Sequence, residues 1–210
     1  MSQLLIKPGS RILFQGDSIT NSGRHHRDDS ILGQGYPNFI AAWLSALYPA
    51  HNLVFLNRGI SGNRIYDLED RWSKDCIDLQ PDYLSILIGV NDTWRIFDSN
   101  TPSPIADFEA CYRRILDRVI KETKAKIILL EPFVLPTQPD RVTWWEDLIL
   151  RIAVVRRVAV DYNAILIPLD GLFAAASTRR EAKCWSADGV HPTQAGHALI
   201  SQAWIDAVTL

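Results

Sequence analysis

Four short polar motifs contain side chains that could carry out acyl-transfer chemistry. The first is GDSIT, residues 16–20, in which Ser18 could act as a nucleophile. A glycine at the end of a strand permits a sharp turn that presents the next side chains at the sheet edge. The alternative is that Ser18 only caps the helix that follows. The G-x-S-x-G elbow of α/β-hydrolases is absent, because Thr20 stands where its second glycine would be.

The second and third motifs offer groups that could stabilise a negative charge. The second is NRGISGN, residues 57–63, whose glycines let a backbone N–H approach a ligand closely. A plain turn between a strand and a helix is the alternative. The third is GVND, residues 89–92, in which the Asn91 amide could donate to a developing oxyanion. An Asx turn is the alternative for this asparagine.

The fourth motif, DGVHP at residues 188–192, supplies a candidate base. Asp188 precedes His191 by three residues, so one turn of chain can bring the carboxylate to a ring N–H and leave the other ring nitrogen free. The alternative is a capping aspartate beside a surface histidine. Taken together, the four motifs provide a nucleophile, oxyanion donors, a base and an orienting carboxylate, which are the parts of an acyl-transfer site.

The other histidines are weaker candidates for chemistry. His25 and His26 lie in the polar run GRHHRDDS, which is typical of a solvated loop. A metal site built from them with Asp28 and Asp29 is the less favoured interpretation. His197 is typical of a residue on a helix face. We therefore expect neither a metal nor a cofactor.

The elements that must position these motifs are those of a parallel α/β sheet. Five runs are apolar at nearly every residue, as in strands that are buried on both faces. Helical patterns alternate with them, which predicts right-handed crossovers and functional groups at the carboxyl ends of the strands. The predicted strands are Ile12–Phe14, Leu53–Leu56, Tyr83–Ile88, Ile127–Leu130 and Ile165–Pro168. The predicted helices are Tyr36–Leu47, Asp67–Ile77, Phe108–Lys121, Leu148–Tyr162 and Thr193–Val208.

Composition limits the class of protein. The 210 residues show no internal repeat or linker, which predicts one domain over 1–210. A net charge of -2 argues against a nucleic-acid partner. Cys76, Cys111 and Cys184 are widely spaced and are expected to be free thiols in a reducing compartment. Without a signal peptide or a membrane-spanning run, we expect a cytoplasmic protein with no membrane partner; whether it forms a homo-oligomer is left open.

With the four motifs in this order, the sequence resembles the SGNH hydrolase superfamily, also called the GDSL esterases and lipases. The resemblance runs from the first strand to the last helix. It implies a flavodoxin-like three-layer α/β/α sandwich with a five-stranded parallel sheet. It also implies that Ser18, His191 and Asp188 form a catalytic triad, and that the N–H groups of Ser18 and Gly62 form an oxyanion hole with Asn91. In GDSIT, isoleucine replaces the leucine of the family signature and is also apolar.

The runs GDSIT, NRGISGN, IGVNDTW and DGVHPTQAGH are most similar to bacterial acetylxylan esterases. This resemblance implies a serine esterase that removes O-acetyl groups from xylan or xylo-oligosaccharides through an acetyl-enzyme intermediate. The expected partner is thus a small-molecule or oligosaccharide acetyl ester. A broad esterase, thioesterase or lysophospholipase with the same site is the alternative. The intact set of motifs argues against a non-catalytic binding module.

Seven tryptophans suit a carbohydrate substrate, because aromatic faces pack well against sugar rings. Trp94 and Trp185 each lie three residues from a motif, so we expect both to line the cleft, although core positions are an equal alternative. Asp17 of the first motif joins them as a candidate substrate-binding residue. For Trp144 and Trp145, a subunit interface or a loop anchor is as good an interpretation as substrate contact.

Overall fold

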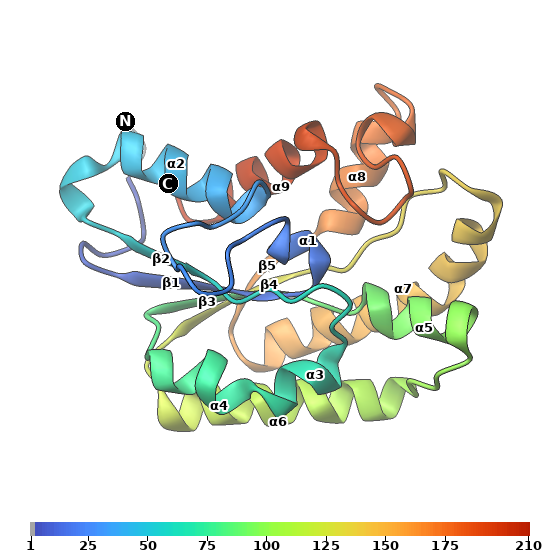
Figure 1. Ribbon diagram of the computed structural model, residues 1–210, viewed down its shortest axis with the longest axis horizontal. Coiled ribbons are helices and arrows are strands. Elements are labelled where there is room, and N and C mark those ends of the chain that lie inside the picture. Colours follow the sequence, from blue (N-terminus) through green and yellow to red (C-terminus); the bar gives the residue numbers. More distant parts are fainter. Residues whose placement is uncertain (1–2) are drawn as a thin grey trace.

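The computed structural model describes residues 3–210, which form a three-layer α/β/α sandwich around a five-stranded parallel sheet (Figure 1). The strand order is β2-β1-β3-β4-β5, and all four strand pairs are parallel. This confirms the predicted flavodoxin-like fold. The strands are β1 (Arg11–Gly16), β2 (Val54–Asn57), β3 (Tyr83–Leu87), β4 (Lys126–Leu130) and β5 (Ile165–Ile167).

Helices cover both faces of the sheet. In Figure 1, α2, α8 and α9 lie on one face and α3 to α7 on the other, while the short α1 sits at the carboxyl end of β1. The first six helices are α1 (Ser18–Asn21), α2 (Tyr36–Leu47), α3 (Ile65–Asp70), α4 (Trp72–Asp75), α5 (Val90–Ser99) and α6 (Ile105–Glu122). The last three are α7 (Pro139–Asp161), α8 (Leu169–Ser177) and α9 (Gln194–Ala207).

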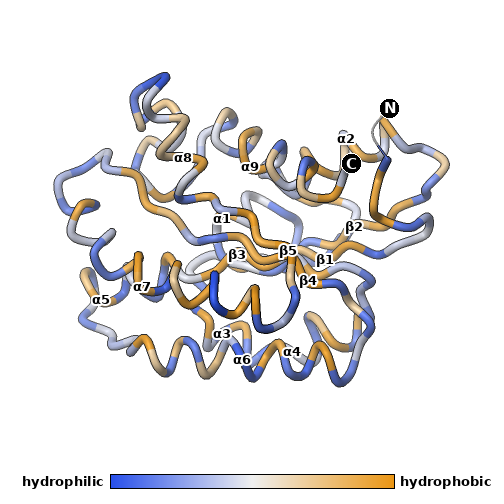
Figure 2. The backbone as a smooth tube through the Cα atoms, turned by 180° about the vertical axis from the view of Figure 1, so that it is seen from behind, coloured by the Kyte–Doolittle hydropathy of each residue, from blue (hydrophilic) through white to orange (hydrophobic). Residues whose placement is uncertain are grey.

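Burial follows the hydropathy pattern. The strands at the centre of the molecule are hydrophobic along most of their length, whereas α4 and α6 alternate between hydrophobic and hydrophilic segments (Figure 2). All five residues of β3 are buried, but the edge strands β2 and β5 are partly exposed. In α6 the buried side chains recur at helical spacing, as the sequence predicted. They are Phe108, Cys111, Tyr112, Ile115, Leu116 and Val119.

The helices differ from the sequence-based expectation in three respects. The region predicted as one helix, Asp67–Ile77, is divided at Arg71 into α3 and α4, and a 3₁₀ turn follows over Ile77–Leu79. Helix α7 begins nine residues early, at Pro139, because proline suits the first turn of a helix. Helices α5 and α8 were not predicted. The strands agree with their predicted ranges to within two residues at each end.

The sheet order reverses around β1, whose neighbours are β2 on one side and β3 on the other. The first three motifs follow these three strands, so the topology brings them to one crevice at the carboxyl edge. No helix within residues 3–210 has the length and apolar character needed to cross a membrane.

Candidate active site

Ser18, His191 and Asp188 form a continuous chain of hydrogen bonds. Ser18 Oγ lies 2.9 Å from His191 Nε2, and His191 Nδ1 lies 2.7 Å from Asp188 Oδ2. Because a carboxylate can only accept, its contact assigns the ring proton to Nδ1 and leaves Nε2 free to accept from the serine hydroxyl. His191 is 44 % exposed, so a substrate can reach it. The arrangement has the geometry of a nucleophile with its base.

The loop that carries Asp188 holds this carboxylate in its charged form. Asp188 Oδ1 accepts from the backbone N–H of His191 at 2.7 Å and of Val190 at 2.9 Å. The Ser186 hydroxyl lies 3.2 Å from the same oxygen and 2.9 Å from the His191 carbonyl oxygen, and can donate to either. Burial alone would raise the pKa of Asp188, but the hydrogen bonds from His191 and Val190 outweigh it and lower the pKa to about 2.

Two positions around the turn that presents Ser18 are packed too tightly for any residue but glycine. A Cβ on Gly16 would lie 2.3 Å from the Leu87 carbonyl oxygen at the end of β3. A Cβ on Gly59, in the second motif, would lie 2.4 Å from the Asn21 nitrogen of α1. The ends of β1, β2 and β3 are therefore in direct backbone contact, and this contact fixes the position of α1.

Asn57 also fixes α1, a role that the sequence did not reveal. This buried side chain donates to the carbonyl oxygens of Thr20 at 2.7 Å and Leu32 at 2.8 Å, and accepts from the Gly59 N–H at 2.9 Å. It thus joins the end of β2 to the helix that begins with Ser18. An asparagine at the start of a polar loop does not indicate, from the sequence alone, which distant carbonyl groups its side chain will bind.

The expected oxyanion donors lie at the start of α1, in the loop before α3 and in the first turn of α5. Asn91 is 2 % exposed and donates one amide hydrogen to the Asn63 carbonyl at 3.1 Å, which leaves a second amide hydrogen available. Gly62 has φ 81°, and within residues 3–210 its N–H has no hydrogen-bond partner. Ser18 is the first residue of α1, where a backbone N–H has no acceptor within the helix. All three groups are chemically able to stabilise an oxyanion.

Asp17 lies beside Ser18 but is turned into the protein. The side chain is 1 % exposed, and its Oδ1 accepts from the Ile19 N–H at 2.9 Å, while Oδ2 is buried without a hydrogen-bond partner. Burial raises the pKa of Asp17 to about 7, despite the Ile19 hydrogen bond and the nearby His191, which both lower it. This buried position indicates that Asp17 stabilises the start of α1, and it argues against the expected contact with substrate.

The structure separates the two tryptophans that were expected to line the cleft. Trp94 lies next to the triad, with its ring centroid 6.0 Å from that of His191. The ring centroid of Trp144 is 5.1 Å from that of Trp94, so a third aromatic residue near the site comes from α7. Trp185 instead donates its indole N–H to the Arg180 carbonyl at 3.4 Å and packs against the core. Substrate contact at Trp185 stays a prediction that these contacts do not support.

Arg141 is a further residue of the site that sequence reasoning missed. Its Nε donates to the Asp188 carbonyl at 2.9 Å, and its Nη1 pairs with Asp140 at 2.6 Å. Its guanidinium carbon lies 3.7 Å from the centroid of the Trp144 ring and 5.5 Å from that of Trp94. One cation thus joins the aromatic residues to the loop of the triad. Only the fold brings these segments together.

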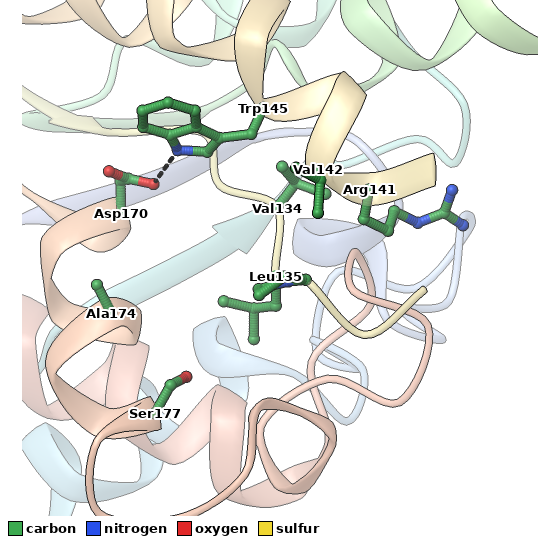
Figure 3. Close-up of a pocket in the computed structure, with 9 residues that line it drawn as sticks. Val134, Leu135, Arg141, Val142, Trp145, Asp170, Ala174 and Ser177 are labelled. Atoms are coloured by element: carbon green, nitrogen blue, oxygen red, sulfur yellow. Dashed lines mark hydrogen bonds between the residues drawn. The ribbon is translucent and has the colours of Figure 1, made fainter. Parts of the chain in front are cut away.

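Two cavities lie on either side of Arg141. The cavity in Figure 3 has a volume of about 400 Å³, lies between α7 and α8 and is mostly apolar. In it, the Trp145 indole N–H donates to Asp170 at 3.3 Å, whereas the Arg141 guanidinium points away from the cavity. The other cavity, of about 390 Å³, lies between α5 and the first turns of α7. It is lined by Trp94, Phe97, Asp98, Asp140, Arg141, Thr143 and Trp144.

The remaining histidines do not form a second site. Among residues 3–210, no group of three or more His, Cys, Asp or Glu side chains is arranged to hold a metal ion. Asp29 pairs instead with Arg58. His197 does lie on a helix, but its side chain is buried and accepts from the Tyr36 N–H at 3.2 Å, and burial lowers its pKa to about 4.

Comparisons with known proteins agree with this geometry. The model of the GDSL-like lipase/acylhydrolase family matches residues 14–199. An acetylxylan esterase from Geobacillus stearothermophilus is 33 % identical over an alignment of 208 residues that covers 95 % of this chain and 94 % of the relative.

Two solved structures are similar over nearly their whole length. The crystal structure of an acetylxylan esterase from Geobacillus stearothermophilus matches with a TM-score of 0.91 at 30 % identity, covering 98 % of this chain and 96 % of that one. An alpha/beta hydrolase enzyme from the metagenome of Lake Arreo, Spain, matches with a TM-score of 0.90 at 30 % identity, covering 98 % of both chains.

Proposed function

The chain belongs to the GDSL-like lipase/acylhydrolase family and is a carboxylic ester hydrolase, and we propose that it removes O-acetyl groups from carbohydrate, specifically from xylan or xylo-oligosaccharides. The observation that carries this proposal is the hydrogen-bonded chain of Ser18, His191 and Asp188, with links of 2.9 Å and 2.7 Å. Support for an acetylated sugar comes from the similarity to an acetylxylan esterase and from the aromatic residues beside His191.

In the proposed reaction, Ser18 Oγ attacks the acetyl carbonyl carbon while its proton passes to His191 Nε2. Asp188 is ionised at neutral pH and stabilises the imidazolium that results. The N–H groups of Ser18 and Gly62 and the Asn91 amide bind the oxyanion. When the tetrahedral intermediate collapses, the bond to the sugar oxygen breaks and His191 returns the proton to that oxygen.

The second half of the reaction releases acetate. The acetyl-enzyme that remains on Ser18 is attacked by water, whose proton passes to His191 Nε2. A second tetrahedral intermediate then collapses: the bond between the acetyl carbon and the serine oxygen breaks, His191 returns its proton to that oxygen, and acetic acid leaves and ionises to acetate. The same residues therefore serve both halves, and no redox or group-transfer cofactor takes part in any step.

The assignment of the nucleophile is tested with a fluorophosphonate probe and the variant Ser18→Ala. We expect the probe to label the wild-type protein at Ser18 and the variant to lose about 10⁴-fold or more in turnover, as when other triads lose a member. The circular dichroism spectrum of the variant, recorded as a control, should match the wild type. Substantial turnover in a folded Ser18→Ala protein would exclude Ser18 as the nucleophile.

The substrate class is tested by acetate release from acetylated xylo-oligosaccharides and by hydrolysis of simple esters from acetyl to octanoyl. We expect acetyl esters to give the highest kcat/KM, because a small acyl site rejects longer chains sterically. Lysophospholipids serve as the lipid control in the same panel. A maximum at hexanoyl or longer would replace the sugar-acetate proposal with a lipase or thioesterase activity of the same site.

A further inference from the structure

We propose that the cavity between α5 and the first turns of α7 is the subsite that binds the acetylated sugar, with Trp94 as its inner wall and Phe97 as its outer wall. This inference rests on the proposed function and adds to it the place of the leaving alcohol. Three features of the described residues carry it: the position of the cavity relative to His191, the chemistry of its lining, and its connection to the triad through Arg141.

The position of the cavity follows from the direction of proton transfer. His191 Nε2 must lie next to the leaving oxygen to protonate it, whereas the carbonyl oxygen points to Gly62 and Asn91. The sugar therefore departs on the histidine side of Ser18. The ring centroids of Trp94 and His191 are 6.0 Å apart, and Trp94 lines the cavity. Trp94 thus joins His191 to this cavity, and a sugar whose leaving oxygen is at His191 can extend past the Trp94 ring into it.

The lining suits a sugar ring, which has apolar C–H faces and polar hydroxyl edges. Phe97 is 43 % exposed, and its ring is stacked on Trp144 at 17° with centroids 6.0 Å apart, so one of its faces is supported. Thr143, Asp98 and Asp140 also line the cavity, where the Asp98 carboxylate pairs with Arg95 and the Asp140 carboxylate pairs with Arg141. Aromatic faces with a few convergent polar groups are the usual composition of such a ligand pocket.

Arg141 couples this cavity to the triad. Its side chain is 7 % exposed, with the guanidinium against Trp144 and Trp94, Nη1 on Asp140, and Nε on the Asp188 carbonyl. The planar Arg141 guanidinium therefore holds Trp94, Trp144 and the loop of Asp188 in fixed positions relative to one another. A sugar bound there is aligned with His191 without a rearrangement of the walls.

The cavity of Figure 3 has a similar volume but a different lining. Val134, Leu135, Pro136 and Val142 make it mostly apolar, and the Asp170 carboxylate is engaged by Trp145. Trp145 is 43 % exposed, the same fraction as Phe97, and it lies on the same helix as Trp144. It therefore offers a matched control for the loss of an exposed aromatic side chain near the site.

The experiment compares acetate release from an acetylated xylo-oligosaccharide and from methyl acetate, whose leaving group is too small to reach Phe97. For Phe97→Ala, we expect kcat/KM on the oligosaccharide to fall about threefold to tenfold further than on methyl acetate, as is usual for the loss of one aromatic contact. Phe97→Leu retains apolar bulk without the ring and should show a similar selective loss. Trp145→Ala should retain wild-type kcat/KM on both substrates.

A second measurement reports binding without catalysis. Non-acetylated xylotriose should inhibit methyl acetate hydrolysis competitively, and Phe97→Ala should weaken this inhibition by a similar factor. Equal losses on both substrates, or a selective loss in Trp145→Ala instead, would overturn the subsite and leave the proposed function intact. If the wild-type protein hydrolyses methyl acetate but releases no acetate from any acetylated oligosaccharide, the proposed function fails and the subsite fails with it.

Discussion

Two aspartates near Ser18 show how surroundings decide the chemistry of one residue type. Hydrogen bonds from His191 and Val190 outweigh burial and lower the pKa of Asp188 to about 2, so it stays charged when His191 takes up a proton. Burial dominates for Asp17 and raises its pKa to about 7. The first carboxylate is thus suited to stabilising an imidazolium. The second is an internal group whose ionisation opposes folding.

The buried position of Asp17 predicts a pH-dependent loss of stability. Its pKa in the folded state, about 7, lies above the ordinary value of 3.8, so its contribution to stability is fully present below pH 3.8 and is lost as the pH rises to about 7. Asp17→Asn removes this titration. We expect the free energy of unfolding of the variant, relative to wild type, to increase by a few kcal/mol between pH 4 and pH 8.

Urea denaturation of both proteins at pH 4, 6 and 8 measures this difference. The pKa of Asp92 is also raised to about 7, mainly by burial, but Asp92 is present in both proteins, so its contribution cancels in the comparison except for its charge interaction with Asp17. Parallel pH profiles for variant and wild type would show that Asp17 does not titrate as described.

Asn91 is predicted to act in the transition state. Asn91→Ala removes an amide donor whose bond to the oxyanion is stronger than its bond to the substrate carbonyl. We therefore expect kcat to fall by about 10²–10³ with little change in KM. Steady-state kinetics on an acetyl ester measures both constants. A rise in KM alone would make Asn91 a ground-state binding residue.

Among the elements, the loop between α8 and α9 is held from within and from outside. Within it, a bridge joins Ser186 and Pro192, and Asp188 Oδ1 accepts from the N–H groups of Val190 and His191. From outside, the segment between β4 and α7 holds it: the Leu135 N–H donates to the Gly189 carbonyl at 2.8 Å, and Arg141 donates to the Asp188 carbonyl. The orientation of the triad is therefore set as much by the start of α7 as by the loop itself.

This dependence predicts that Gly189→Ala is damaging. Gly189 has φ 86°, which costs a residue with a Cβ about 1–2 kcal/mol, and the new Cβ would lie 2.5 Å from the Leu135 carbonyl oxygen. We expect a lower melting temperature and a kcat reduced by about tenfold or more, because a shift of the loop misplaces Asp188.

The matched control is Gly171→Ala in α8, where a new Cβ meets no atom within 4 Å and alanine is the better helix former. This variant should keep its kcat and lose no stability. Wild-type melting temperature and kcat in Gly189→Ala would show that the loop does not need this backbone conformation.

At the scale of the whole molecule, the site exists only because distant segments meet. Ser18 and His191 are 173 positions apart, yet their side chains are 2.9 Å apart. In Figure 1, the short α1 lies at the carboxyl end of β1, and the loop before α9 lies on the same side of the sheet. The apolar cores on the two faces of the sheet fix this arrangement, one mainly with α2, α8, α9 and the first half of α7, and the other mainly with α3, α4, α6 and the second half of α7.

The assembled site predicts activity that does not depend on a metal. In the proposed mechanism His191 performs the proton transfers and three N–H donors stabilise the oxyanion, so no step needs a Lewis acid. We expect EDTA to leave kcat/KM for an acetyl ester unchanged. Added zinc without prior chelation serves as the control for inhibition by metal. Activity that EDTA removes and zinc restores would contradict this mechanism.

The sequence by itself predicted the five strands, the sheet they form and the four motifs at its carboxyl edge. These features are local, because an apolar run followed by glycine and polar residues marks both a buried parallel strand and the functional turn after it. The family resemblance added roles for Ser18, Gly62, Asn91, Asp188 and His191. The structure brings Ser18, Asp188 and His191 into hydrogen-bonding contact, whereas their catalytic roles stay predictions until the variants are measured.

Only the tertiary structure decided which aromatic residues lie beside the triad and what holds its loop. Trp94 and Trp185 are equally close to motifs along the chain, but Trp94 packs against His191 and Trp144, while the Trp185 indole N–H donates to the Arg180 carbonyl. The place of Arg141 at the site carries no signal in the sequence, because the partners that put it there are Trp94 on α5 and Asp188, which lies in a loop 47 positions away. Such contacts depend on how helices pack across the sheet, and that packing is a property of the whole core rather than of any local pattern.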